Sequence, residues 1–73
     1  MSRENVDFEA IRSRIKAYRK DAELSQEAFG KPLGLRRQDV NAIESGNRNP
    51  GLTVLYRIVN EYELTFDWLL LGE

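Results

Sequence analysis

The sequence predicts an all-α fold of five short helices, and three features of its 73 residues support this class. Apolar residues recur at intervals of three and four along most of the chain, which is the period of an amphipathic helix. Serine, threonine, aspartate, glycine and proline interrupt the pattern where helices are expected to begin and end. No segment has a convincing strand pattern, so no β-strand is expected.

Length and composition limit the possible classes of protein. A chain of 73 residues forms one domain, and 41% hydrophobic with 32% charged residues is typical of a globular domain. We divide it into an N-terminal tail, residues 1–6, and a helical domain, residues 7–73. The chain lacks cysteine and histidine, so we expect no disulfide, metal or cofactor. No apolar run approaches the roughly 20 residues of a membrane span, and a signal-like core is absent, so a cytoplasmic protein is expected.

The first helix is expected over about residues 7–20. Asp7 can cap its N-terminus with a side-chain oxygen. Phe8, Ile11, Ile15 and Tyr18 follow at spacings of three, four and three, which places them on one stripe. This stripe is predicted to face the core.

The second helix begins after Ser25, a good N-cap, and buries Phe29 and Leu33. Gly34 can end it in a left-handed conformation. Pro32 lies inside the segment, where it removes a backbone hydrogen bond and clashes with the preceding turn. A short or kinked helix is therefore predicted.

The third helix, residues 36–45, has two different sides. At about 100° per residue, Val40 and Ile43 share one side, and Asp39 lies in the first turn, where an acid suits the helix dipole. The opposite side carries Arg37, Gln38, Asn41, Ala42 and Ser45. Gly46 is expected to end this helix.

Two further helices complete the domain. The fourth is expected over about residues 52–62, with an apolar stripe made of Leu52, Leu55, Ile58, Val59 and Tyr62. The fifth is the segment "FDWLLLG", which Thr65 can cap and Gly72 can end.

Charge is sorted along the chain although the net charge is only −1. Residues 1–30 carry six positive and six negative side chains. Residues 31–57 carry five positive against two negative, a local +3, and residues 58–73 carry four negative and no positive, a local −4. We expect these two regions to face different partners.

The polar side of the third helix has the chemistry needed to contact base edges in a DNA major groove. Arginine can donate two hydrogen bonds to guanine, and glutamine or asparagine can pair with adenine. Ala42 can contact a thymine methyl group. The groove, about 12 Å wide, admits one α-helix. A polar helix face on its own is more often a solvated surface than a binding site.

The segment "QEAFGKPLGLRRQDVNAIES", residues 26–45, resembles the helix-turn-helix of the Xre and phage repressor/Cro family, which has the lambda-repressor-like fold. "LSQEAFG", "IESGNRNP" and "FDWLLLGE" extend the resemblance over nearly the whole chain. Gly30 matches the small residue at the crossing of the second and third helices. The resemblance implies a transcriptional regulator, of the repressor type found in phages and mobile elements, that binds double-stranded DNA in a sequence-specific way.

Three positions depart from the family pattern. Arg36 replaces the usual serine or threonine cap of the third helix, so a less well capped start is expected. Pro32 is unusual in the second helix, and Gly51 replaces a serine cap before the fourth. Glycine costs only a few tenths of a kcal/mol at that position.

The resemblance also implies roles for single residues. Base contacts are expected from Arg37, Gln38 and Asn41, with Arg36 and Ala42 at the margin. Phosphate contacts are expected from Gln26, Ser25, Ser45, Asn47 and Arg48. Glu44 is expected to form a structural ion pair with Arg19, which would lock the first helix to the third.

A homodimer is expected because one recognition helix covers few base pairs, and dimers of this class contact two half-sites about 34 Å apart. With Trp68, Leu70 and Leu71, the fifth helix carries more apolar surface than it can turn toward the core. An apolar patch left exposed in this way marks an interface. We expect these three residues to form the two-fold contact.

Two other functional classes are compatible with parts of the sequence. A protein-interaction module, or an antitoxin-like regulator that binds a protein through its acidic, apolar C-terminal end, is favoured by the low isoelectric point of about 5.5. An enzyme is disfavoured because the acids are scattered, without paired-carboxylate or metal-ligand spacing.

Overall fold

The computed structural model describes residues 6–73, and the all-α class predicted from sequence is confirmed over that range. The helices are α1 (Phe8–Asp21), α2 (Gln26–Gly30), η1 (Lys31–Leu33), α3 (Arg37–Ser45), α4 (Leu52–Glu61) and η2 (Asp67–Leu71). Of the predicted tail, residues 1–5 lie outside the described part of the chain. None of the helices within residues 6–73 is long and apolar enough to cross a membrane.

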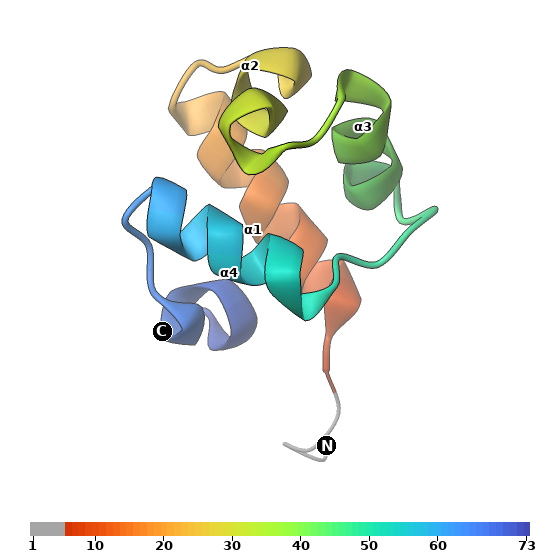
Figure 1. The fold of residues 1–73 in the computed structure, drawn as a ribbon. Helices are drawn as coiled ribbons and strands as arrows, with labels where there is room; N and C mark the ends of the chain where they lie inside the picture. The colour runs from red at the N-terminus through yellow and green to blue at the C-terminus, as the bar shows by residue number, and fades with distance from the viewer. Residues whose placement is uncertain (1–5) are drawn as a thin grey trace.

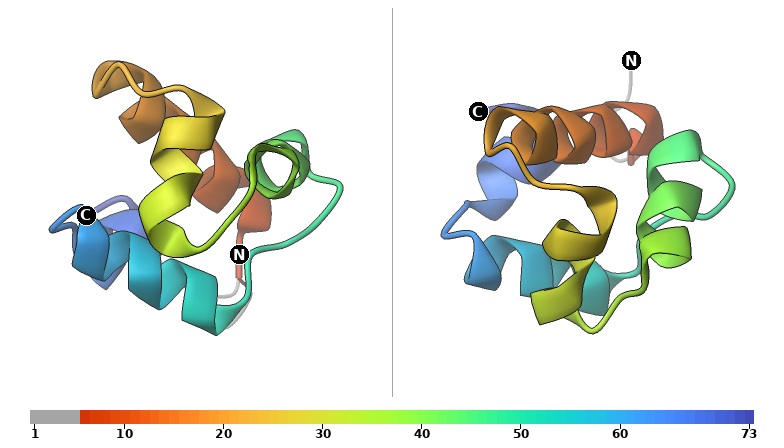
Figure 2. Two further views of the ribbon diagram at one scale, coloured as in Figure 1. Left: turned by 45° about the horizontal axis from the view of Figure 1, so that its top comes forward. Right: turned by 90° about the horizontal axis from the view of Figure 1, so that it is seen from above.

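The helices surround one core. Seen from above, α1 and α4 lie on opposite sides, α3 lies at one end, and α2 with η1 lies between them (Figure 2). The C-terminal turn η2 packs against α1, at the other end of the molecule from α3 (Figure 1). The core consists of Ile11, Ile15, Phe29, Leu33, Val40, Ile43, Leu55, Ile58 and Leu69.

The second predicted helix is divided in two by its proline, as expected. The α-helix stops at Gly30, and a 3₁₀ turn with Pro32 as its second residue continues to Leu33. Gly34 then adopts the left-handed conformation with φ 74°. A short helix followed by this turn delivers the chain to the start of α3.

The start of α3 has no side-chain N-cap, as the sequence indicated. Arginine has only donors in its side chain, so Arg36 cannot cap the helix as serine does. Instead, Asp39 Oδ2 accepts the Arg36 backbone N–H at 2.8 Å, which is half of a capping box. The expectation of a less well capped start is therefore confirmed for the Arg36 side chain, and Asp39 supplies only the reciprocal half of the box. The helix also begins at Arg37, one residue later than predicted.

Two interhelical turns have the same backbone structure. They are residues 23–25, with the sequence Glu-Leu-Ser, and residues 63–65, with the sequence Glu-Leu-Thr. Each glutamate has a left-handed backbone, with φ of 61° and 54°. Each leucine N–H donates to the carbonyl five residues earlier at 3.0 Å. Each hydroxyl then accepts the N–H three residues later at 3.0 Å, which starts the next helix. The predicted N-caps Ser25 and Thr65 are therefore present.

For the C-terminal half, one prediction needs correction and one is confirmed as a shorter element. Leu52, assigned to the buried stripe of the fourth helix, is 76% exposed because it occupies the first residue of α4, beyond the edge of the core. The fifth helix is a single π-helical turn of five residues, from Asp67 to Leu71, that ends at the left-handed Gly72.

Candidate functional site

Helix α3 has a buried side and an exposed side, and the division follows the sequence pattern. Val40 and Ile43 are only 2% and 3% exposed and are part of the core. The other side of the helix carries the exposed residues Arg37, Gln38, Asn41 and Ser45, with Ala42 half-buried among them. The rotation of α3 about its axis is thus fixed by burial of its aliphatic residues, and that rotation turns the amides and the guanidinium outward.

Close packing at Gly30 fixes the distance between α2 and α3. A Cβ atom at this position would lie 2.7 Å from Val40 Cγ2 and 3.0 Å from the Leu35 carbonyl oxygen. Both distances are shorter than an ordinary van der Waals contact. The two helices can approach this closely only because residue 30 has no side chain.

An ion pair joins α1 to α3 beside this crossing. Arg19 Nε donates to Glu44 Oε2 at 2.7 Å, and Arg19 Nη2 donates to Glu44 Oε1 at 3.0 Å. The side chains are 11% and 3% exposed, and Arg19 Nη1 also donates to the Leu24 carbonyl at 2.8 Å. The hydrogen bond to Glu44 raises the pKa of Arg19 above its ordinary value. This bidentate pair is the one that the sequence resemblance implied.

Gln26, the first residue of α2, connects the ion pair to the exposed face of α3. Its Nε2 atom lies 3.1 Å from Glu44 Oε1 and 3.3 Å from Asn41 Oδ1. Both amide hydrogens therefore have acceptors within the protein. In this arrangement Gln26 has no side-chain hydrogen to donate to a phosphate, and its oxygen is the atom left for an external partner.

A shallow groove of about 290 Å³ lies along this network. It is lined by Lys16, Arg19, Lys20, Gln26, Asn41, Glu44 and Ser45. The two lysines, four residues apart on α1, bring positive charge next to the polar face of α3. In the sequence, Lys16 and Lys20 are four residues apart and lie outside the apolar stripe of the first helix, so they share an exposed side of that helix.

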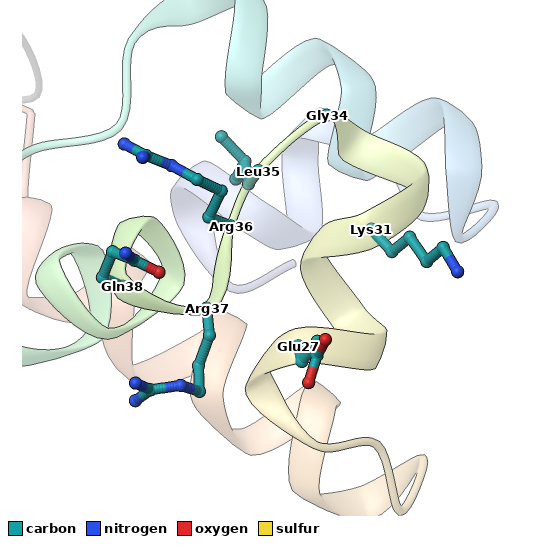
Figure 3. A pocket seen from close by; sticks show the side chains of 7 residues that line it. All are labelled: Glu27, Lys31, Gly34, Leu35, Arg36, Arg37 and Gln38. Atoms are coloured by element: carbon teal, nitrogen blue, oxygen red, sulfur yellow. The ribbon is translucent and has the colours of Figure 1, made fainter.

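A second groove, of about 500 Å³, separates α2 and η1 from the start of α3 (Figure 3). Figure 3 shows Glu27 projecting from α2 on one side and Arg37 from the beginning of α3 on the other. Arg36 extends away from Glu27, next to Leu35. The groove places two adjacent arginines at the N-terminal end of the exposed face.

Of the residues expected near phosphates, Asn47 and Arg48 are exposed in the loop after α3. Arg48 Nη1 lies 3.4 Å from Asp39 Oδ1, so the loop is linked back to the first turn of α3. The Arg36 backbone N–H, followed by the guanidinium groups of Arg36 and Arg48, lowers the pKa of Asp39.

The two serines differ in what they can still donate. Ser25 Oγ accepts the Ala28 N–H at 3.0 Å, which leaves its hydroxyl hydrogen for an external acceptor. Ser45 Oγ donates to the Ala42 carbonyl at 3.2 Å, so its hydrogen is used within α3. Ser25 is thus better prepared than Ser45 to donate to a phosphate.

The C-terminal turn η2 exposes less apolar surface than the sequence suggested. Trp68 and Leu70 are half-buried and pack against the core, whereas Leu71 is 61% exposed. Leu71 is therefore the residue of this group that offers most apolar surface to a partner.

Residues 15–69 match the family described as Helix-turn-helix. The chain belongs to this family. The match covers the helix-turn-helix unit together with α4 and most of the C-terminal turn. It confirms the resemblance seen in the sequence.

Relatives of this helix-turn-helix domain are named as regulators. One from Archaeoglobus fulgidus, an uncharacterized HTH-type transcriptional regulator, is 35% identical over 52 residues, covering 71% of this chain and 73% of its own. The uncharacterized regulator YqaE of Bacillus subtilis is 36% identical over 59 residues, covering 81% of this chain and 51% of its own.

A solved structure has the same fold. The P22 c2 repressor protein, in complex with the synthetic operator 9T, superposes with a TM-score of 0.76 at 27% identity. The similarity covers 86% of this chain and 96% of the repressor chain. The predicted lambda-repressor-like architecture is therefore confirmed.

Proposed function

We propose that this protein is a sequence-specific, double-stranded DNA-binding transcriptional regulator of the repressor type. The observation that carries the proposal is the two-sided α3, whose core residues are at most 3% exposed while arginine and amide groups cover the other side. The chain is also similar to a repressor bound to operator DNA and to relatives named as transcriptional regulators, which supports the same conclusion. The protein-interaction alternative receives no support from these relatives.

In the proposed complex α3 lies in the major groove. Arg37, Gln38 and Asn41 contact base edges, because their hydrogen-bonding groups are exposed along one side of the helix. Arg36 and Ala42 lie at the margin of this set. Arg36 is at the groove shown in Figure 3, and Ala42 is half-buried between the exposed amides and the core.

Phosphate contacts flank the base contacts in this proposal. Ser25 stands before α2, and Asn47 and Arg48 lie in the loop after α3. Ser45, the last residue of α3, reaches a phosphate as a donor only by giving up its bond to the Ala42 carbonyl. Gln26 Nε2 donates to Glu44 and Asn41, so Gln26 reaches a phosphate as a donor only when one of these bonds is given up. Lys16 and Lys20 add positive charge along the same groove. Such contacts fix position and orientation without specifying sequence.

We further propose a homodimer that contacts two half-sites about one helical turn apart. Leu71 supplies the exposed apolar surface of this contact, and the half-buried Trp68 and Leu70 lie beside it on η2. Figure 1 places η2 far from α3, so a contact there leaves the exposed face of α3 open.

The test is selection from a randomised duplex DNA library by the purified protein, alongside the double variant Arg37→Ala/Gln38→Ala. Enrichment of an inverted repeat, lost or altered in the double variant, is the expected result. Asn60→Ala, which truncates an exposed amide on α4, serves as the control and should leave the selected sequence unchanged. No enrichment by the folded wild-type protein would refute the proposed function.

Binding to the selected duplex should also weaken as salt increases. The logarithm of the affinity is expected to fall linearly with the logarithm of salt concentration, with a slope of about −0.9 for each phosphate neutralised. A slope near zero would contradict a phosphate-contacting interface.

A further inference from the structure

Two arginines from opposite ends of α3 meet at one carboxylate. Arg36 precedes the helix and Arg48 lies in the loop after it, yet both contact Asp39. Arg36 Nε lies 3.5 Å from Asp39 Oδ2, and Arg48 Nη1 lies 3.4 Å from Asp39 Oδ1. The Arg36 backbone N–H donates to Oδ2 at 2.8 Å, which holds the carboxylate in place. Each guanidinium group therefore contacts a different oxygen of the same carboxylate.

The carboxylate is covered, whereas the two guanidinium groups are open to a ligand. The side chain of Asp39 is only 16% exposed, but those of Arg36 and Arg48 are 76% and 49% exposed. A guanidinium group has five N–H donors. Within residues 6–73, Asp39 is the acceptor that each of these two side chains contacts, through one nitrogen each. Most of their donors are therefore available to an external acceptor.

The charge of this cluster matches one phosphate group of DNA. Two guanidinium groups and one ionised carboxylate sum to a single positive charge. Each phosphate of the DNA backbone carries a single negative charge. It also has two unesterified oxygens, so each arginine can donate to one of them. Neither Arg36 nor Arg48 would have to leave Asp39 to do so.

The cluster lies along one flank of the exposed face of α3. At about 100° per residue, Asp39 and Glu44 are about 140° apart around the helix, so they lie on opposite flanks. Glu44 faces α1 and α2, through its bonds to Arg19 and Gln26. Figure 3 shows the Arg36 side chain extending away from α2. The cluster thus occupies the flank that does not face α2, and a helix in the major groove has a DNA backbone strand along each flank.

We propose that Arg36 and Arg48 bind one and the same DNA phosphate, and that Asp39 holds their guanidinium groups together for this purpose. The inference rests on the proposed function. It assigns Arg36 to the DNA backbone instead of the margin of the base contacts. Asp39 acts as a positioning residue, because its covered carboxylate contacts the two arginines and not the phosphate.

The experiment uses the operator found by library selection, in a set of duplexes that each carry one methylphosphonate. This substitution removes the charge of one phosphate and leaves every base unchanged. Affinities are measured for wild type, Arg36→Ala and Arg48→Ala. On the unmodified operator, each variant is expected to bind about tenfold more weakly than wild type. On the duplex that lacks the shared phosphate charge, wild type should lose a similar factor, and both variants should bind about as well as wild type.

The control is Arg14→Ala, which removes an arginine that donates to the Leu69 carbonyl at 3.0 Å, on the η2 side of α1. Its effect on affinity should be the same on every modified duplex. Circular dichroism verifies that all variants are folded.

Three results would overturn the inference. The first is that Arg36→Ala and Arg48→Ala lose their effects on different duplexes, which would mean two separate phosphates. The second is that Arg36→Ala changes the selected base sequence, and the third is that either variant binds the unmodified operator as well as wild type. In all three cases the protein still selects DNA, whereas failure to select any sequence overturns the proposed function instead.

The role of Asp39 is tested with Asp39→Asn, which keeps the size of the side chain and an oxygen for the Arg36 N–H. Arg36→Ala and Arg48→Ala are each combined with Asp39→Asn and compared with Asp39→Asn alone, so a uniform effect of the lost charge cancels. Without the ionised carboxylate, the effects of the two arginines should no longer disappear on one common duplex. If they still do, Asp39 is not a positioning residue.

Discussion

At the scale of single residues, two contacts fix where α3 lies. The Arg19–Glu44 pair holds it to α1, and the missing side chain at Gly30 lets it approach α2. Arg19 and Glu44 are largely buried and Gly30 has no side chain, so none of the three adds an exposed side chain to the outer face of α3. Substitutions at these positions are therefore expected to lower the stability of the domain, and to act on DNA contacts only through that loss of stability.

Glu44→Ala should destabilise the domain strongly. It leaves the guanidinium of Arg19, 11% exposed, without its carboxylate, and breaking such a pair costs about 3 kcal/mol or more. In a domain of this size each kcal/mol lowers Tm by about 4–8 °C. Thermal unfolding followed by circular dichroism measures the loss, with the exposed Glu61→Ala as the control; an unchanged Tm would refute a stabilising role for the pair.

Gly30→Ala should lower the free energy of unfolding by about 1–3 kcal/mol. The added methyl group would lie 2.7 Å from Val40 Cγ2 and force α2 and α3 apart. Gly51→Ser is the contrasting change. Nothing lies within 4 Å of a Cβ at Gly51, and serine should improve the cap of α4 by a few tenths of a kcal/mol. Urea unfolding of both variants gives the two free energies; equal values would argue against close packing at Gly30.

At the scale of helices, the sequence predicted the existence and order of the elements but not every end. Apolar spacing and cap residues were sufficient for α1, α2 with its proline break, and α4, because those signals are local. The start of α3 was placed one residue early, and the bond from the Arg36 N–H to Asp39 was not foreseen. Leu52 was placed in the core because periodicity does not show where a core ends.

The candidate site was predicted to a similar extent. The exposed set on α3 and the Arg19–Glu44 pair followed from helical geometry and from the family resemblance. The hydrogen bonds from Gln26 to Glu44 and Asn41 join residues 18 and 15 positions apart, so no local pattern could indicate them. The direction of two amide groups became apparent only once α2 and α3 were placed together.

The cap at the start of α3 predicts a pH effect on stability. The pKa of Asp39 is lowered in the folded protein by the Arg36 N–H and by the nearby guanidinium groups, so folding favours the ionised carboxylate. The resulting stabilisation is present above the ordinary pKa of an aspartate and is lost as the pH falls through the lowered value. Melting from about pH 6 to about pH 2.5 should show a shallower decline for Asp39→Asn than for wild type. Parallel curves would contradict this assignment.

At the scale of the whole molecule, the exposed face of α3 and the exposed apolar residue of η2 lie at different ends (Figure 1). This separation allows one domain to bind DNA and a second copy at the same time. The half-buried state of Trp68 and Leu70 limits the apolar contact area on η2, so we expect a dimer that is weak in the absence of DNA.

Leu71→Glu should shift sedimentation toward the monomer and reduce affinity for a two-half-site duplex more than for a single half-site. The matched control is Leu52→Glu, which changes an even more exposed leucine at the start of α4 and should leave self-association unchanged. If wild type sediments as a monomer at high concentration, both alone and with the duplex, the proposed dimer is wrong.

The sorting of charge along the chain has a consequence for how fast the protein finds DNA. The segment with the local +3 includes α3, and the segment with the local −4 includes η2 at the other end of the molecule, so the nearly neutral domain carries an electric dipole. In the field of a polyanion such a dipole orients during approach, so that α3 turns toward DNA before contact. Added salt should therefore slow association, because orientation fails when the field is screened within about 8 Å at physiological ionic strength.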